Sequence, residues 1–193
     1  MTEASKPFNG VIKLDVRDSV ADWTPYTLPK APEGAPNVLV ILYDDTGQAS
    51  WSPYGGRINM PTLDKLADNG LTYTQWHTTA LCSPTRSTFL TGRNHHVNRC
   101  ASITEGSNGF PGAAARLPAE CATIGQVLQD NGFSTYWIGK NHNVPVEDIS
   151  ACGNRSEWPL SKGFDRFYGF LGGETNQWYP DLVVDNHFTE PPA

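Results

Sequence analysis

The sequence of 193 residues lacks several features that would point to common classes of protein. Its first ten residues hold no apolar stretch of the kind found in a secretory signal. No apolar run approaches the length of a membrane span. Basic residues are outnumbered 14 to 20, which gives a formal net charge of −6. Because neither a secretory signal nor a membrane span is seen, we expect a cytoplasmic protein. An acidic chain binds nucleic acid and anionic membranes poorly, so we expect neither as a partner.

Cysteine is also scarce, with four residues in the whole chain. None of them forms a Cys-x-x-Cys pair, so the sequence does not predict a zinc site. In a cytoplasmic protein we expect Cys100, Cys121 and Cys152 to be free thiols. Internal repeats and low-complexity tracts are absent as well.

The first part of the chain differs from the rest in its pattern. Residues 1–36 are rich in proline, which interrupts regular elements, and they show little apolar periodicity. We interpret them as an N-terminal arm packed over the surface. Residues 37–193 contain the regular apolar patterns and form the second predicted unit.

Strands and helices are predicted to alternate along this second unit. Residues 37–43 form a continuous apolar run typical of a strand buried on both faces, and 71–77 and 133–138 are two further predicted strands. Residues 61–70 and 123–132 have helical patterns that end in glycine. The order indicates an α/β fold with a largely parallel central sheet flanked by helices, in which ligands gather at the carboxyl ends of strands.

Two adjacent carboxylates, Asp44 and Asp45, directly follow the first predicted strand. A divalent cation would relieve their mutual repulsion, and hard oxygen ligands suit calcium or magnesium. An acidic turn on the surface remains the alternative.

A helix is predicted to begin near Cys82. Ser83 is a plausible N-cap, and Phe89 and Leu90 would face the core. Cys82 would then lie at the helix N-terminus, where free N–H groups favour negative charge, with Arg86 one turn further on. Helix physics alone favours a buried structural cysteine before an ordinary capped helix.

Three separated motifs change that interpretation, because together they resemble the type I, formylglycine-dependent sulfatases. The nucleophile signature is Cys-x-Pro-x-Arg at residues 82–86, followed by Leu-Thr-Gly-Arg at 90–93. Asp-Asp-Thr-Gly at 44–47, with Tyr-Gly-Gly at 54–56, is similar to the first metal-binding segment of the family. Gly-Lys-Asn-His at 139–142 resembles its Gly-Lys-x-His segment. The resemblance implies an alkaline-phosphatase-like fold, of which residues 37–193 would be the N-terminal, truncated part.

The resemblance also implies an activity and a modified residue. A formylglycine-generating enzyme would oxidise Cys82 to formylglycine (3-oxoalanine). One hydroxyl of the hydrated aldehyde would attack the sulfur of an arylsulfatase-type, small-molecule sulfate ester, and the second would expel sulfate. Asp44 and Asp45, with residue 82, would hold a calcium ion, magnesium being less favoured.

Three further residues receive roles by the same resemblance. Arg86 would orient the diol and balance negative charge. Lys140 would bind the sulfate oxygens and stabilise charge in the transition state. His142 would act as the base that takes the proton from the second hydroxyl.

Other interpretations stay open at the level of sequence. The family's remaining metal ligands and a second sulfate-binding His and Lys are expected further downstream, and residues 185–187 are read as a loop rather than a metal site. A phosphonate or phosphate ester hydrolase of the same superfamily shares the visible motifs. An inactive, truncated sulfatase-like fragment is the alternative outside the enzymes.

Overall fold

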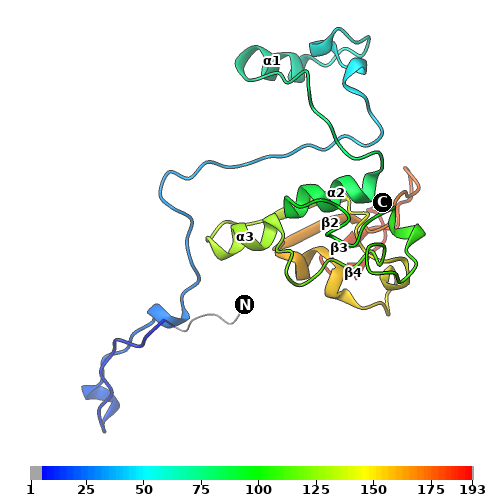
Figure 1. Cartoon of the computed structure of the whole chain (residues 1–193). Coiled ribbons are helices and arrows are strands. Elements are labelled where there is room, and N and C mark those ends of the chain that lie inside the picture. Colours follow the sequence, from blue (N-terminus) through cyan, green and yellow to red (C-terminus); the bar gives the residue numbers. More distant parts are fainter. Residues whose placement is uncertain (1–5, 193) are drawn as a thin grey trace.

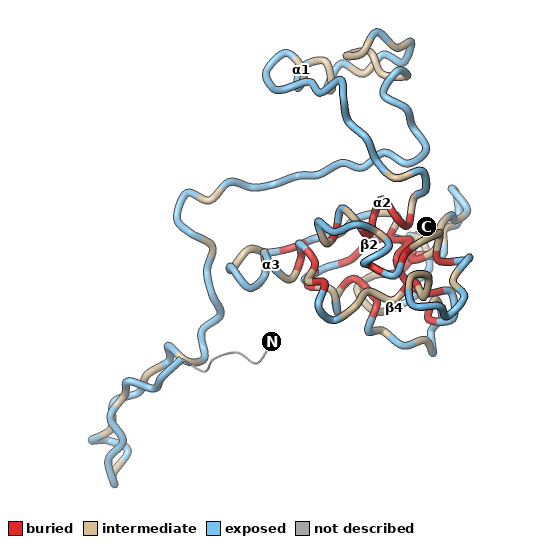
Figure 2. Tube along the Cα trace, viewed as in Figure 1, coloured by how far each residue is buried: buried red, intermediate tan, exposed pale blue. Residues whose placement is uncertain are grey.

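The computed structural model describes residues 6–192. Most of the buried residues lie in one compact part of the chain. This part holds the helices α2 and α3 and all four strands, whereas α1 and the N-terminal segment stand apart from it (Figure 1). Figure 2 shows the same division, with buried residues gathered around α2 and the strands and an exposed trace leading to the N-terminus. The N-terminal segment meets the compact part where the Ala31 N–H donates to the Gly132 carbonyl at 3.0 Å.

The four strands form one mixed sheet in the order β1-β2-β3-β4. β1 (Tyr136–Lys140) and β2 (Arg166–Phe170) are parallel along their whole length. β3 (Val183–Val184) and β4 (His187–Phe188) add short antiparallel pairings. The fold is therefore α/β with a partial sheet, and its longest pairing is parallel.

The three helices lie where the sequence predicts them. α1 (Pro61–Asn69) begins with proline and stops before Gly70. α2 (Cys82–Thr91) ends at Gly92, which adopts the left-handed conformation that glycine tolerates best. α3 (Ile124–Asp130) begins with a capping box, in which the Thr123 and Gln126 side chains bond each other's backbone N–H groups. Within residues 6–192, none of the helices has the length and apolar character needed to cross a membrane.

Two of the three predicted strands are wrong. Residues 37–43 and 71–77 are exposed and belong to neither a helix nor a strand. An extended apolar segment becomes a strand only when a neighbouring strand pairs with its backbone N–H and C=O groups. Among the described residues no strand pairs with either segment, so the backbone N–H and C=O groups of both segments can bond to water instead. The third prediction is confirmed but shifted, because β1 begins at Tyr136 rather than at residue 133.

The apolar core lies beside the sheet and fixes the loop that follows β1. Val144, Trp158, Phe167, Leu171 and Val183 form one buried cluster. The indole N–H of Trp158 donates to a backbone carbonyl at 3.1 Å, so its burial leaves no polar group unpaired. Packing of Val144 and Leu171 in this core holds the chain immediately after β1 and after β2.

Candidate active site

A three-residue ion network lies at the carboxyl end of β1. Lys140, the last residue of β1, places its Nζ 2.5 Å from Asp44 Oδ2. Arg86, on α2, places Nη2 3.4 Å from Asp44 Oδ1 and donates from Nη1 to the Lys140 carbonyl at 2.9 Å. The network thus joins three segments that are far apart in the sequence, although only Lys140 lies at the end of a strand.

The two cations in this network are well shielded from water. The Lys140 and Arg86 side chains are 11% and 8% exposed, and that of Asp44 is 38% exposed. Burial raises the pKa of the Asp44 carboxyl, but the hydrogen bonds and charges of Lys140 and Arg86 outweigh it and hold that pKa below its usual value. Asp44 is therefore ionised at neutral pH.

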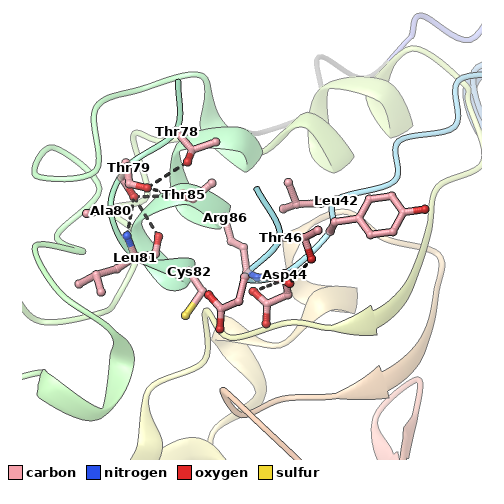
Figure 3. A pocket seen from close by; sticks show the side chains of 12 residues that line it. Leu42, Asp44, Thr46, Thr78, Thr79, Ala80, Leu81, Cys82, Thr85 and Arg86 are labelled. Atoms are coloured by element: carbon pink, nitrogen blue, oxygen red, sulfur yellow. Dashed lines mark hydrogen bonds and ion pairs between the residues drawn. The ribbon is translucent and has the colours of Figure 1, made fainter. Parts of the chain in front are cut away.

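Cys82 lines a cavity together with Asp44 and Arg86 of the ion network. It is the first residue of α2 and is half-buried. A cavity of about 200 Å³ is lined by Cys82, Asp44, Asp45 and Arg86, together with threonine side chains. Figure 3 shows the Cys82 sulfur and the paired Arg86 and Asp44 side chains around this cavity. The two candidate ligands and two residues of the nucleophile signature, Asp44, Asp45, Cys82 and Arg86, therefore share one small, polar space.

The start of α2 differs from the predicted cap. Leu81, not Ser83, is the N-cap residue, and no side chain caps the helix. Ser83 lies within the first turn, where its hydroxyl accepts the Thr104 backbone N–H at 3.3 Å. Leu90 is buried as predicted, but Phe89 is 42% exposed, because it lies on the side of α2 away from the core.

His142 pairs with a carboxylate that sequence reasoning missed. Its Nε2 lies 2.8 Å from Glu105 Oε2, and its side chain is almost fully buried. Burial lowers the pKa of His142, and the charges of Lys140 and Arg86 add to this, against the raising effect of Glu105. Burial likewise raises the pKa of Glu105, but its hydrogen bond to His142 outweighs burial and lowers it. We conclude that His142 is neutral and Glu105 is ionised at neutral pH.

The carboxylates present do not by themselves complete a metal site. Asp45 lines the cavity in the left-handed conformation, with φ of 49°. Both oxygens of Asp44 are already engaged by cations. Within residues 6–192, no three side chains of His, Cys, Asp or Glu group closely enough to hold a metal ion. Asp44 and Asp45 could supply two hard oxygen ligands, whereas calcium takes about six to eight.

The other cysteines are free thiols in this structure, as is Cys82. Cys100 is buried, and desolvation, which outweighs the lowering effect of a hydrogen bond with Ser87, raises its pKa to about 11. Its thiol is therefore protonated and chemically quiet at neutral pH.

Comparison with known proteins decides the family. The model of the family described as Sulfatase matches residues 36–190. The chain belongs to the sulfatase family. Arylsulfatase D of Homo sapiens is 36% identical over 152 residues, which cover 75% of this chain and 25% of that protein. The arylsulfatase of Klebsiella aerogenes is 30% identical over 150 residues, covering 77% and 31%. Steryl-sulfatase of Homo sapiens is 35% identical over 141 residues, covering 69% and 23%.

A solved structure agrees with the family assignment. The crystal structure of Ps i-CgsB matches with a TM-score of 0.54 and 30% sequence identity, over 69% of this chain and 27% of that chain. The same protein matches equally well in complex with k-i-k-neocarrahexaose. The fold of this sulfatase-family chain is thus alkaline-phosphatase-like, with a sheet that is only partial. The chain spans between 23% and 31% of the length of the three curated relatives named above.

Proposed function

We propose that this chain carries the nucleophile portion of a sulfuric ester hydrolase that acts on small-molecule sulfate esters of the aryl sulfate class. The observation that carries the proposal is the shared cavity, in which Cys82 lies with Asp44 and with Arg86. In the proposal a formylglycine-generating enzyme converts Cys82 to formylglycine, and water adds to its aldehyde to give a gem-diol. One hydroxyl of the diol attacks sulfur and displaces the alcohol or phenol, and the second loses its proton so that sulfate is expelled and the aldehyde re-forms.

The ion network supplies positive charge where an anionic substrate needs it. The chain is acidic overall, so a sulfate group needs local cations to enter the site. Lys140 and Arg86 are two such cations, and both are held in place by the carboxylate of Asp44. We assign Lys140 to the sulfate oxygens and Arg86 to residue 82, because a cation fixed before the reaction stabilises developing charge without reorganisation.

We assign the proton-accepting role to His142. A base must be unprotonated at the working pH, and burial keeps this imidazole neutral. A calcium ion, which the family resemblance implies, would use Asp44 and Asp45 as two of its ligands. The described residues do not furnish the remaining ligands, so we assign no step to the ion.

Mass spectrometry of the chain co-expressed with a formylglycine-generating enzyme tests the proposal. Trapping with a hydrazine should label the peptide that contains Cys82, because it alone carries the Cys-x-Pro-x-Arg pattern. Cys152 is the matched control, since it is an exposed free thiol without that pattern. Cys82→Ala should abolish labelling.

Two results would count against the proposal. One is a Cys82 peptide that stays unmodified while a known substrate of the same enzyme is converted. The other is turnover of an aryl phosphonate in preference to the matched aryl sulfate by a protein that carries the modified residue, which would favour phosphoryl chemistry.

A further inference from the structure

Glu105 has no place in any of the motifs, yet its side chain meets the proposed base. The Glu105 carboxylate contacts His142 Nε2 at 2.8 Å, and the Thr104 hydroxyl donates to the same oxygen at 3.3 Å. The His142 side chain is 4% exposed and that of Glu105 is 44% exposed. An ionised carboxylate can only accept hydrogen bonds, so the proton of the neutral imidazole must lie on Nε2.

This contact leaves the other ring nitrogen as the basic one. His142 Nδ1 is buried and has no hydrogen-bond partner among the described residues. When Nε2 carries the proton, Nδ1 carries a lone pair that can accept one. A buried acceptor without a partner is costly, and such a group in a native structure calls for an explanation.

Two hydrogen bonds tie the neighbours of this pair to Ser83, the residue after Cys82. The Thr104 N–H donates to the Ser83 hydroxyl at 3.3 Å, and the Asn143 side-chain amide donates to the Ser83 carbonyl at 3.0 Å. The neighbours of Glu105 and of His142 are therefore both bonded to the residue that follows Cys82. His142 itself has φ of 52°, a conformation that few residues other than glycine adopt, so its backbone is constrained as well.

From these contacts we infer that Glu105 is a positioning residue for His142: it accepts the Nε2 proton, fixes the ring, and reserves Nδ1 as the proton acceptor. This inference deepens the proposed function, on which its catalytic meaning rests. The fixed tautomer of His142 and the dependence of its pKa on the Glu105 carboxylate can both be measured without any activity.

The experiment is nitrogen NMR of the histidine rings in the full 193-residue chain, without modification of Cys82. In the wild-type chain, His142 should carry its proton on Nε2 at neutral pH. Glu105→Gln keeps an oxygen that can accept this proton but removes the negative charge. The Nε2-protonated form should therefore persist, while the pKa of His142 falls by about one unit, the lower end of the effect of a nearby opposite charge.

The control variant must leave the other charged groups that face His142 in place. Besides Glu105, these are Lys140 and Arg86, which remain in every variant. Glu120→Gln removes the same charge from an exposed residue elsewhere and should leave the His142 titration unchanged. The other four histidines report any general change of fold.

The possible outcomes distinguish failure of the inference from failure of the proposed function. A wild-type His142 that is protonated on Nδ1 overturns the inference without use of any variant. So does a His142 pKa that moves no further in Glu105→Gln than in Glu120→Gln. If the tautomer and the shift are as expected but Cys82 is never converted to formylglycine, the positioning role stands and the proposed function fails.

Discussion

Replacement of Asp44 by asparagine removes the only anion from the ion network. The Lys140 and Arg86 side chains would keep their buried positions but lose the negative charge between them. An exposed ion pair contributes about 0–1 kcal/mol, whereas removing one partner of a buried pair costs about 3–5 kcal/mol. Because the cations are buried but Asp44 is 38% exposed, we expect Asp44→Asn to lower the free energy of unfolding by about 2 kcal/mol at pH 7.

The pH dependence gives this prediction a sign that can be checked. The pKa of Asp44 in the folded chain lies below its ordinary value of 3.8. A carboxyl whose pKa is lowered by folding stabilises the chain above the unfolded pKa and loses that contribution as the pH falls through the folded pKa. The difference between wild type and Asp44→Asn should therefore be constant above about pH 5 and shrink below about pH 4.

Urea denaturation of the two chains between pH 3 and 7 measures this difference, with Asp45→Asn as the matched control. Asp45 is the adjacent carboxylate, and within residues 6–192 it forms no ion pair. Asparagine also tolerates its left-handed backbone, with φ of 49°. We expect the control to stay within about 0.5 kcal/mol of wild type. Equal losses in the two variants, or a loss in Asp44→Asn that does not change with pH, would show that the network does not stabilise the fold.

Two further predictions concern the same site. Gly173→Ala should displace the His142 ring, because the new Cβ would lie 2.7 Å from two of its atoms, and NMR should then show less of the Nε2-protonated form. Gly172→Ala is the control: its Cβ would meet one backbone atom at 3.7 Å, so the His142 tautomer should stay unchanged. Calcium titration of this chain by calorimetry should give a dissociation constant weaker than about 10⁻³ M, because two carboxylates are far fewer than the six to eight oxygens that the ion takes. Submicromolar binding would show that the described residues form a better site than their geometry indicates.

Two of the three motifs could be placed from sequence because each is tied to the end of a local element. Lys140 was expected just beyond a strand, and it ends β1. Cys82 was expected at a helix N-terminus, and it is the first residue of α2. Asp44 was expected to meet Lys140 at the carboxyl ends of parallel strands, and it does contact Lys140, but the segment before it is not a strand.

The two missing strands show what periodicity cannot supply. The apolar run at residues 37–43 predicts burial in a sheet, but a strand also needs a neighbour for its backbone, which the pattern of one segment does not contain. In the described part of the chain, β1 pairs with β2, and neither 37–43 nor 71–77 joins the sheet. Propensity and pattern describe a segment, whereas pairing depends on the whole fold.

Glu105 was beyond the reach of sequence reasoning for a related reason. It lies in a short 3-10 helical turn, Thr104–Gly106, with no surrounding motif, and it meets His142 only through tertiary contacts. Glu105 adds the negative charge that faces His142. Burial lowers the pKa of His142 and favours the neutral base, and the charges of Lys140 and Arg86 lower this pKa further, but none of these effects selects which ring nitrogen holds the proton. The Glu105 carboxylate makes that selection and also raises the pKa of His142, but burial outweighs this effect, so the imidazole stays neutral.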